Sequence, residues 1–96
     1  MNELEPFLRN VGTATWSMED GIAFEVALNG IDSVVGAYTR LIAQARSADD
    51  TQKARDFAAQ RGRWSARRRR ITPADRATVD AVISESARLL EQLRAR

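Results

Sequence analysis

The chain of 96 residues contains no cysteine and no histidine. The first absence excludes disulfides and thiolate chemistry, and the second removes the commonest metal ligand and the usual general base near neutral pH. No apolar run approaches the roughly 18 residues needed to cross a bilayer, and the acidic start lacks the basic and apolar regions of a signal peptide. These absences argue against structural zinc and predict a cytoplasmic protein.

Catalytic groups are equally scarce. The serines and threonines have no histidine to activate them, and the single lysine, Lys53, lies among charged residues. The neighbouring acids Glu19–Asp20 and Asp49–Asp50 point about 100° apart on a helix and cannot jointly hold a metal ion. No phosphate loop, EF-hand spacing or dinucleotide fingerprint is present. We therefore expect a protein that is not an enzyme and uses no cofactor, metal or small-molecule substrate.

Charge is distributed unevenly, although the net charge is only +2. Residues 1–46 carry six acidic and three basic side chains, whereas residues 47–96 carry seven acidic and twelve basic ones. Such asymmetry is consistent with pairing between the two halves or with an acidic partner for the basic half. The sequence leaves both open.

Apolar side chains in residues 17–46 recur at alternating spacings of four and three, which is the period of one helix face. They cover an arc of about 120°, wide enough to contact two neighbouring helices. Asn29-Gly30 joins two poor helix formers, so the sequence predicts either one long helix or two helices broken there. The candidate association seam consists of Leu28, Ile31, Val34, Val35, Tyr38, Leu41 and Ile42.

Helix starts are predicted at three hydroxyl residues, each followed three positions later by an acid. These are Ser17, Ser47 and Thr72, and Thr72 is followed directly by Pro73, a residue favoured in the first turn. With a further short segment near the start, the expected helices cover about residues 3–10, 17–46, 48–70 and 73–95. We expect one all-α domain over residues 1–96, a small three- to four-helix bundle whose long first helix packs on a helical hairpin.

Residues 61–70 hold six arginines and one tryptophan. None of the six has an acid three or four positions away, the spacings that pair on a helix surface. Their counter-charges must therefore come from another helix, from solvent ions or from another molecule. Trp64 falls at sevens with Phe57 and Ile71, which favours burial of its ring. The candidate partner-binding cluster consists of Arg61, Arg63, Trp64, Arg67, Arg68, Arg69 and Arg70.

Three interpretations of this cluster remain open: pairing with acids of the first helix, an acidic protein surface, and a nucleic-acid backbone. The wide apolar arc and the lack of catalytic groups favour a non-enzymatic helical interaction protein. It would act by self-association as a homo-oligomer, or as a small regulatory or adaptor subunit of a larger protein complex. The alternative is a nucleic-acid-binding module using the basic cluster of residues 61–70. No membrane partner is indicated.

Overall fold

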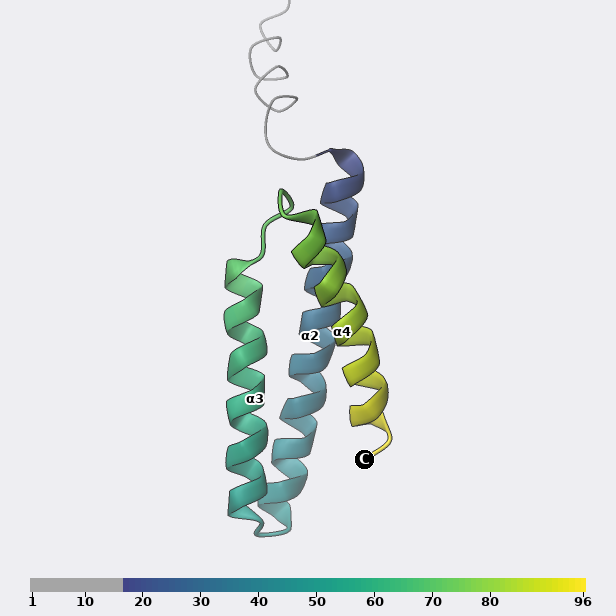
Figure 1. Ribbon diagram of the computed structural model, residues 1–96. Coiled ribbons are helices and arrows are strands. Elements are labelled where there is room, and N and C mark those ends of the chain that lie inside the picture. The colour runs from purple at the N-terminus through teal and green to yellow at the C-terminus, as the bar shows by residue number, and fades with distance from the viewer. Residues whose placement is uncertain (1–16) are drawn as a thin grey trace, which may run out of the picture.

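The computed structural model describes residues 17–96, which form three helices and no strand. Helix α2 spans Met18–Ser47, α3 spans Thr51–Arg70 and α4 spans Arg76–Arg94 (Figure 1). The described part of the chain is therefore all-α, as the apolar periodicity predicts. The short helix expected at residues 3–10 lies outside the described residues.

Helix α2 is continuous through Asn29-Gly30. Its start is fixed by the expected capping box, in which Ser17 Oγ accepts from the Asp20 amide at 3.1 Å and the Asp20 carboxylate accepts from the Ser17 amide at 3.2 Å. Gly30 faces α4 so closely that a Cβ added there would lie 2.4 Å from Ser86 Oγ. A glycine at this position therefore serves close helix packing rather than a turn.

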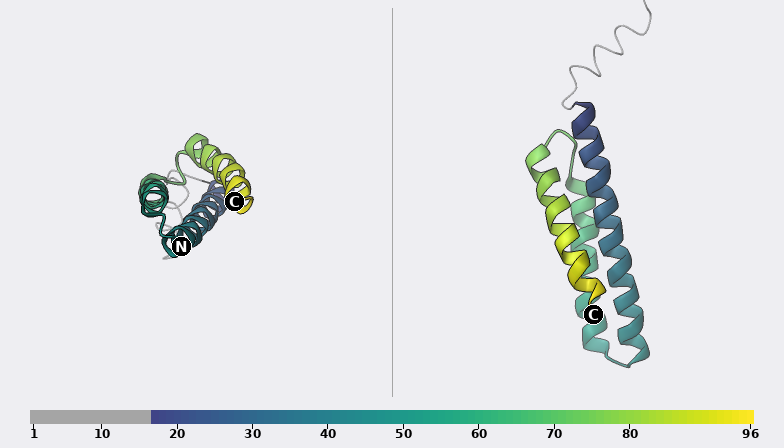
Figure 2. Two further views of the ribbon diagram at one scale, coloured as in Figure 1. Left: turned by 90° about the horizontal axis from the view of Figure 1, so that it is seen from below. Right: turned by 90° about the vertical axis from the view of Figure 1, so that its right-hand side faces the viewer.

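Helix α2 is the element on which the other two pack. Helix α3 returns alongside it, and α4 then runs beside it in the direction of α2 itself (Figures 1 and 2). No Cα atom of α3 comes within 8 Å of one in α4. The sequence predicts a hairpin in which α3 and α4 pack on each other, and this packing is the part of the prediction that is wrong. The wide apolar arc of α2 contacts two helices at once, so each of them buries its own apolar line against α2.

The core follows that arc from one end of α2 to the other. Its larger part lies where all three helices run together, and a smaller cluster of Ile42, Ala45 and Ala54 joins α2 to α3 alone. The larger part contains Ala23, Ala27, Ile31, Val34, Tyr38, Leu41, Trp64, Val79, Val82 and Leu93.

Helix α3 begins at Thr51, three residues later than Ser47 predicts. Ser47 is the last residue of α2, and the chain reverses through Asp49, whose φ of 57° lies in the left-handed region. Asp50 then caps α3 by accepting from the Lys53 amide at 3.1 Å. The acid that was expected inside the first turn is therefore the cap itself.

Helix α4 also begins three residues late, at Arg76 rather than Pro73. The Asp75 carboxylate accepts from the Thr78 amide at 3.2 Å and from the Thr78 hydroxyl at 2.7 Å, so Asp75 is the cap. Thr72 accepts the Asp75 amide through its carbonyl at 3.1 Å and closes a turn instead. Thr72 and Asp75 are both suitable caps, and the helix begins after Asp75 because its carboxylate accepts two hydrogen bonds.

Candidate interaction surfaces

The six arginines of residues 61–70 all lie on α3, but they have different partners. Arg67 pairs with Glu85 of α4 at 2.6 Å, and Arg68 pairs with Asp32 of α2 at 2.9 Å. Arg61 donates to the Thr39 hydroxyl at 3.1 Å. The remaining three are exposed and make no ion pair with any residue of the described range 17–96; they are Arg63, Arg69 and Arg70.

Trp64 is part of the core and retains only 7% of its exposure. The guanidinium of Arg67 lies over its ring, 4.5 Å from the ring centroid, while the same group holds Glu85. Burial by its neighbours leaves no free ring face of Trp64 for a nucleic-acid base. The expectation that the line of Phe57, Trp64 and Ile71 holds this helix to its neighbours is confirmed for Trp64.

Arg68 ties α3 to α2 through an exposed ion pair. Its Nε donates to Asp32 Oδ1 at 2.9 Å, and this hydrogen bond raises the pKa of the Arg68 guanidinium, with Glu25 adding a weaker attraction. Exposed pairs of this kind contribute little stability, on the order of 0 to 1 kcal/mol. Among the described residues, the acids of α2 therefore neutralise only part of the basic cluster.

Most side chains of the candidate association seam are buried in the core. Ile31, Val34, Tyr38, Leu41 and Ile42 are buried, and Leu28 and Val35 are half-buried. Burial raises the pKa of the Tyr38 hydroxyl. Because α3 and α4 already cover these side chains, the seam is core and offers no free surface for a second copy.

A different face of α2 carries exposed apolar side chains. Met18, Ile22 and Val26 retain 84%, 60% and 47% of their exposure. Their spacing of four residues puts them in one line along the helix. Sequence reasoning missed them because it followed only the longer seam, although the repeat at i, i+4 and i+8 is visible in the sequence.

This exposed line continues into a groove between α2 and α4. The groove has a volume of about 270 Å³ and a mostly apolar lining. Val26, Asn29, Gly30 and Ser33 contribute from α2, and Ile83, Ser86, Ala87 and Leu90 contribute from α4. The line and the groove together form one apolar surface that the described residues leave uncovered.

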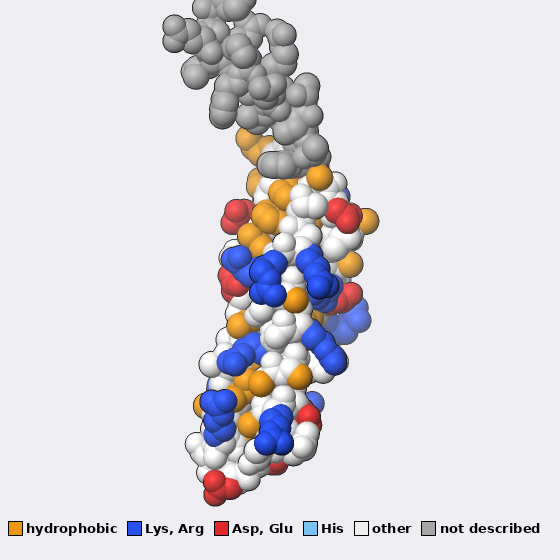
Figure 3. Space-filling view, turned by 90° about the vertical axis from the view of Figure 1, so that its left-hand side faces the viewer, with side chains coloured by type: hydrophobic (Ala, Val, Ile, Leu, Met, Phe, Trp, Pro, Cys, Tyr) orange, Lys and Arg blue, Asp and Glu red, His pale blue; other side chains and the backbone are white. Residues whose placement is uncertain are grey.

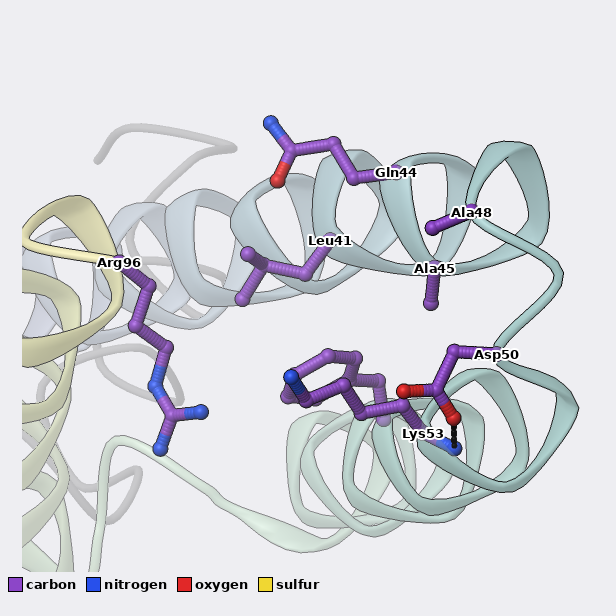
Figure 4. A pocket seen from close by; sticks show the side chains of 8 residues that line it. Leu41, Gln44, Ala45, Ala48, Asp50, Lys53 and Arg96 are labelled. Atoms are coloured by element: carbon purple, nitrogen blue, oxygen red, sulfur yellow. Dashed lines mark hydrogen bonds between the residues drawn. The ribbon is translucent and has the colours of Figure 1, made fainter.

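A second hollow lies between the lower ends of α2 and α3, where α4 has already ended (Figures 1 and 4). Leu41, Ala45 and Phe57 line it, with Lys53 and Arg96 at its rim. Its one carboxylate, Asp50, is engaged as the cap of α3 (Figure 4).

The remaining titratable groups with shifted pKa values have structural roles. A hydrogen bond from Arg76, together with the Ser17 amide, lowers the pKa of Asp20, and the Thr78 hydroxyl and amide lower that of Asp75. Residues 17–96 include no group of three or more side chains that could hold a metal ion. Among the same residues, no helix has the length and apolar character to span a membrane.

Comparison with protein-family models, with curated proteins and with solved structures returns no match. Over residues 17–96, the geometry is thus that of a three-helix all-α bundle with one exposed apolar face and one exposed basic face.

Proposed function

We propose that the protein is a non-enzymatic helical interaction protein that pairs with a second copy of itself through the solvent-exposed face of α2. The observation that carries this proposal is the exposed line of Met18, Ile22 and Val26. Apolar side chains exposed together in this way mark association surfaces in soluble proteins. The wide seam expected to serve this purpose is buried, so the association surface moves to the opposite side of the same helix.

The same face of α2 changes character halfway along. Beyond Asn29, the line continues with Ser33 and Gly36, and a Cβ added at Gly36 would meet nothing within 4 Å. Large side chains thus occupy one half of the line and small ones the other. In an antiparallel pair of α2 helices with its two-fold axis near Asn29, the Ile22 side chain of each copy lies against Gly36 of the other.

Such a pair satisfies the symmetry of a two-fold dimer, in which one surface meets itself. Large-on-small contacts allow the two helix axes to approach within the usual 8–10 Å. The pairing also brings Arg40 of one copy beside Glu19 of the other, which adds a favourable rim contact. Shape and charge therefore support the antiparallel arrangement.

The free energy available is modest. Burying the exposed parts of the three apolar side chains contributes about 3 to 5 kcal/mol per copy at the usual value for a buried aliphatic side chain. Association costs about 4 kcal/mol or more in lost translational and rotational freedom. We therefore expect a weak dimer whose population rises with concentration.

Sedimentation velocity over a range of protein concentrations tests the proposal. The wild-type chain is expected to shift from monomer to dimer, and Ile22→Glu is expected to remain monomeric. Ala77→Glu, an exposed alanine on α4 given the same charge change, is the control and should associate like the wild type. If the wild-type chain is monomeric at every concentration, self-association is contradicted. The exposed line would then be assigned to binding a helix of a larger partner.

A further inference from the structure

The outer face of α3 carries charge that the described fold does not neutralise. Within residues 51–70 there are eight basic side chains and one acidic side chain. Arg67 and Arg68 are paired with acids of the other helices. Four other arginines are exposed and make no ion pair with any residue of the range 17–96: Arg55, Arg63, Arg69 and Arg70.

Three of these four arginines lie on the two sides of one ridge, and the fourth lies at its end. At about 100° per residue, Ala59, Gly62 and Ala66 lie along the side of α3 that faces away from α2. Arg69 falls on one side of these small residues, and Arg63 and Arg70 fall on the other. Arg55 lies in line with them, one turn before Ala59. The space-filling view of this side of the molecule shows basic side chains in two columns with small and apolar side chains between them (Figure 3).

We propose that this face of α3 binds the phosphate backbone of double-stranded DNA. An α-helix is about 10–12 Å across, and the major groove of B-form DNA is about 12 Å wide. A ridge without long side chains lets the helix enter the groove, and arginines on both sides of the ridge then reach phosphates of the two strands. Each of these contacts neutralises a phosphate and releases a counterion.

Two further observations favour DNA over the alternatives. Interfaces with proteins depend on buried aromatic or large apolar anchors, but the ridge carries only alanine and glycine, and Trp64 is turned into the core. Double-stranded RNA has a deep and narrow major groove that side chains cannot enter. Because alanine and glycine have no hydrogen-bonding side chain, the ridge does not read bases, and binding is expected to be independent of sequence.

The proposal does not depend on self-association, because α3 packs on the buried apolar arc of α2, whereas Met18, Ile22 and Val26 lie on the exposed face of that helix. The test is fluorescence anisotropy of the full chain with a labelled mixed-sequence DNA duplex of about 20 base pairs. With about four phosphate contacts, the logarithm of affinity falls with the logarithm of salt concentration with a slope of about −3.6. The affinity should therefore drop roughly 100-fold between about 50 and 200 mM salt.

Two pairs of variants locate the surface. Ala59→Glu puts a carboxylate on the ridge and should weaken DNA binding by about tenfold or more, because the carboxylate repels the phosphates. Ala77→Glu on α4 gives the same net charge and should change the affinity for DNA by less than about twofold. Arg63→Gln with Arg70→Gln should halve the salt slope, whereas Arg88→Gln with Arg94→Gln on α4 should leave it unchanged. Circular dichroism confirms that each variant is helical.

The outcomes separate the proposal from its competitors. No binding to the duplex at low salt overturns it. Equal losses from Ala59→Glu and Ala77→Glu also overturn it, because binding then follows net charge rather than the outer face of α3. Binding of an acidic polypeptide but not of DNA at the same arginines assigns the face to an acidic protein instead. If Ile22→Glu still binds the DNA duplex, DNA binding does not require association through α2.

Discussion

Gly30, Gly36 and Gly62 lie within the helices, and replacing each with alanine is expected to change stability with different signs. In a helix interior, alanine is favoured over glycine by about 1 kcal/mol. At Gly36 and Gly62 a Cβ would meet nothing within 4 Å. Gly36→Ala and Gly62→Ala should therefore each stabilise the protein by up to about 1 kcal/mol, or about 4–8 °C in Tm for a domain of this size.

Gly30 is different because its neighbour across the α2–α4 contact is close. A Cβ there would lie 2.4 Å from Ser86 Oγ and 3.2 Å from Ser86 Cβ, and the Ser86 side chain is only 2% exposed. Overpacking of a buried contact costs about 1–3 kcal/mol. Subtracting the gain of about 1 kcal/mol in helix propensity from this cost, we expect Gly30→Ala to destabilise the protein by up to about 2 kcal/mol.

Thermal and urea unfolding followed by circular dichroism measure both effects on the same scale. Adding Ser86→Ala to Gly30→Ala removes the hydroxyl that lies closest and should recover part of the loss, with a coupling free energy on the order of 1 kcal/mol. If Gly30→Ala instead raises Tm as much as Gly36→Ala does, then α4 does not approach α2 at Gly30 and the packing described above is wrong.

Two further predictions concern the helix caps. Because Asp75 rather than Thr72 caps α4, Asp75→Ala should cost about 1 kcal/mol in chemical denaturation and Thr72→Ala much less; the reverse order would restore Thr72 as the cap. Because Arg76 and the Ser17 amide hold the folded-state pKa of Asp20 below its ordinary value of 3.8, the stability it contributes is fully present above about pH 4 and is lost as the pH falls through the lowered pKa. Tm measured from neutral to acidic pH should accordingly decline less steeply for Asp20→Asn than for the wild type, and parallel profiles would assign the acid sensitivity elsewhere.

Much of the secondary structure follows from the sequence for physical reasons. The apolar repeat of α2 keeps its phase through Asn29-Gly30, and burial of Ala27 before the pair and Ile31 after it outweighs the poor helix propensity of the pair. The capping box at Ser17 has no nearby competitor, and its prediction is confirmed.

Other features could not be predicted from the sequence because they depend on alternatives of similar free energy or on contacts between distant residues. Thr72 and Asp75 are both good caps, and only the additional bond from the Thr78 hydroxyl favours Asp75. The partners of Arg67 and Arg68 lie 18 and 36 residues away, on other helices, so local spacing does not predict them.

The interaction surfaces were predicted only in part. The arginine cluster was identified, but Arg55 was not, because it lies outside the dense run of residues 61–70 and joins the same face only through the helical period. The apolar seam was identified correctly as an arc that contacts two helices, yet both contacts are made within the chain. The exposed line of Met18, Ile22 and Val26 was overlooked beside it.

Site-specific cross-linking tests self-association through α2 most directly. The chain has no cysteine of its own, so Asn29→Cys introduces a single thiol at the proposed two-fold axis. A disulfide requires Cα atoms about 4.4–6.8 Å apart, which the antiparallel pairing provides at this position. Under mild oxidation, Asn29→Cys should form a covalent dimer rapidly and Ala77→Cys should not. Equal, slow cross-linking of both variants would contradict pairing through this face of α2.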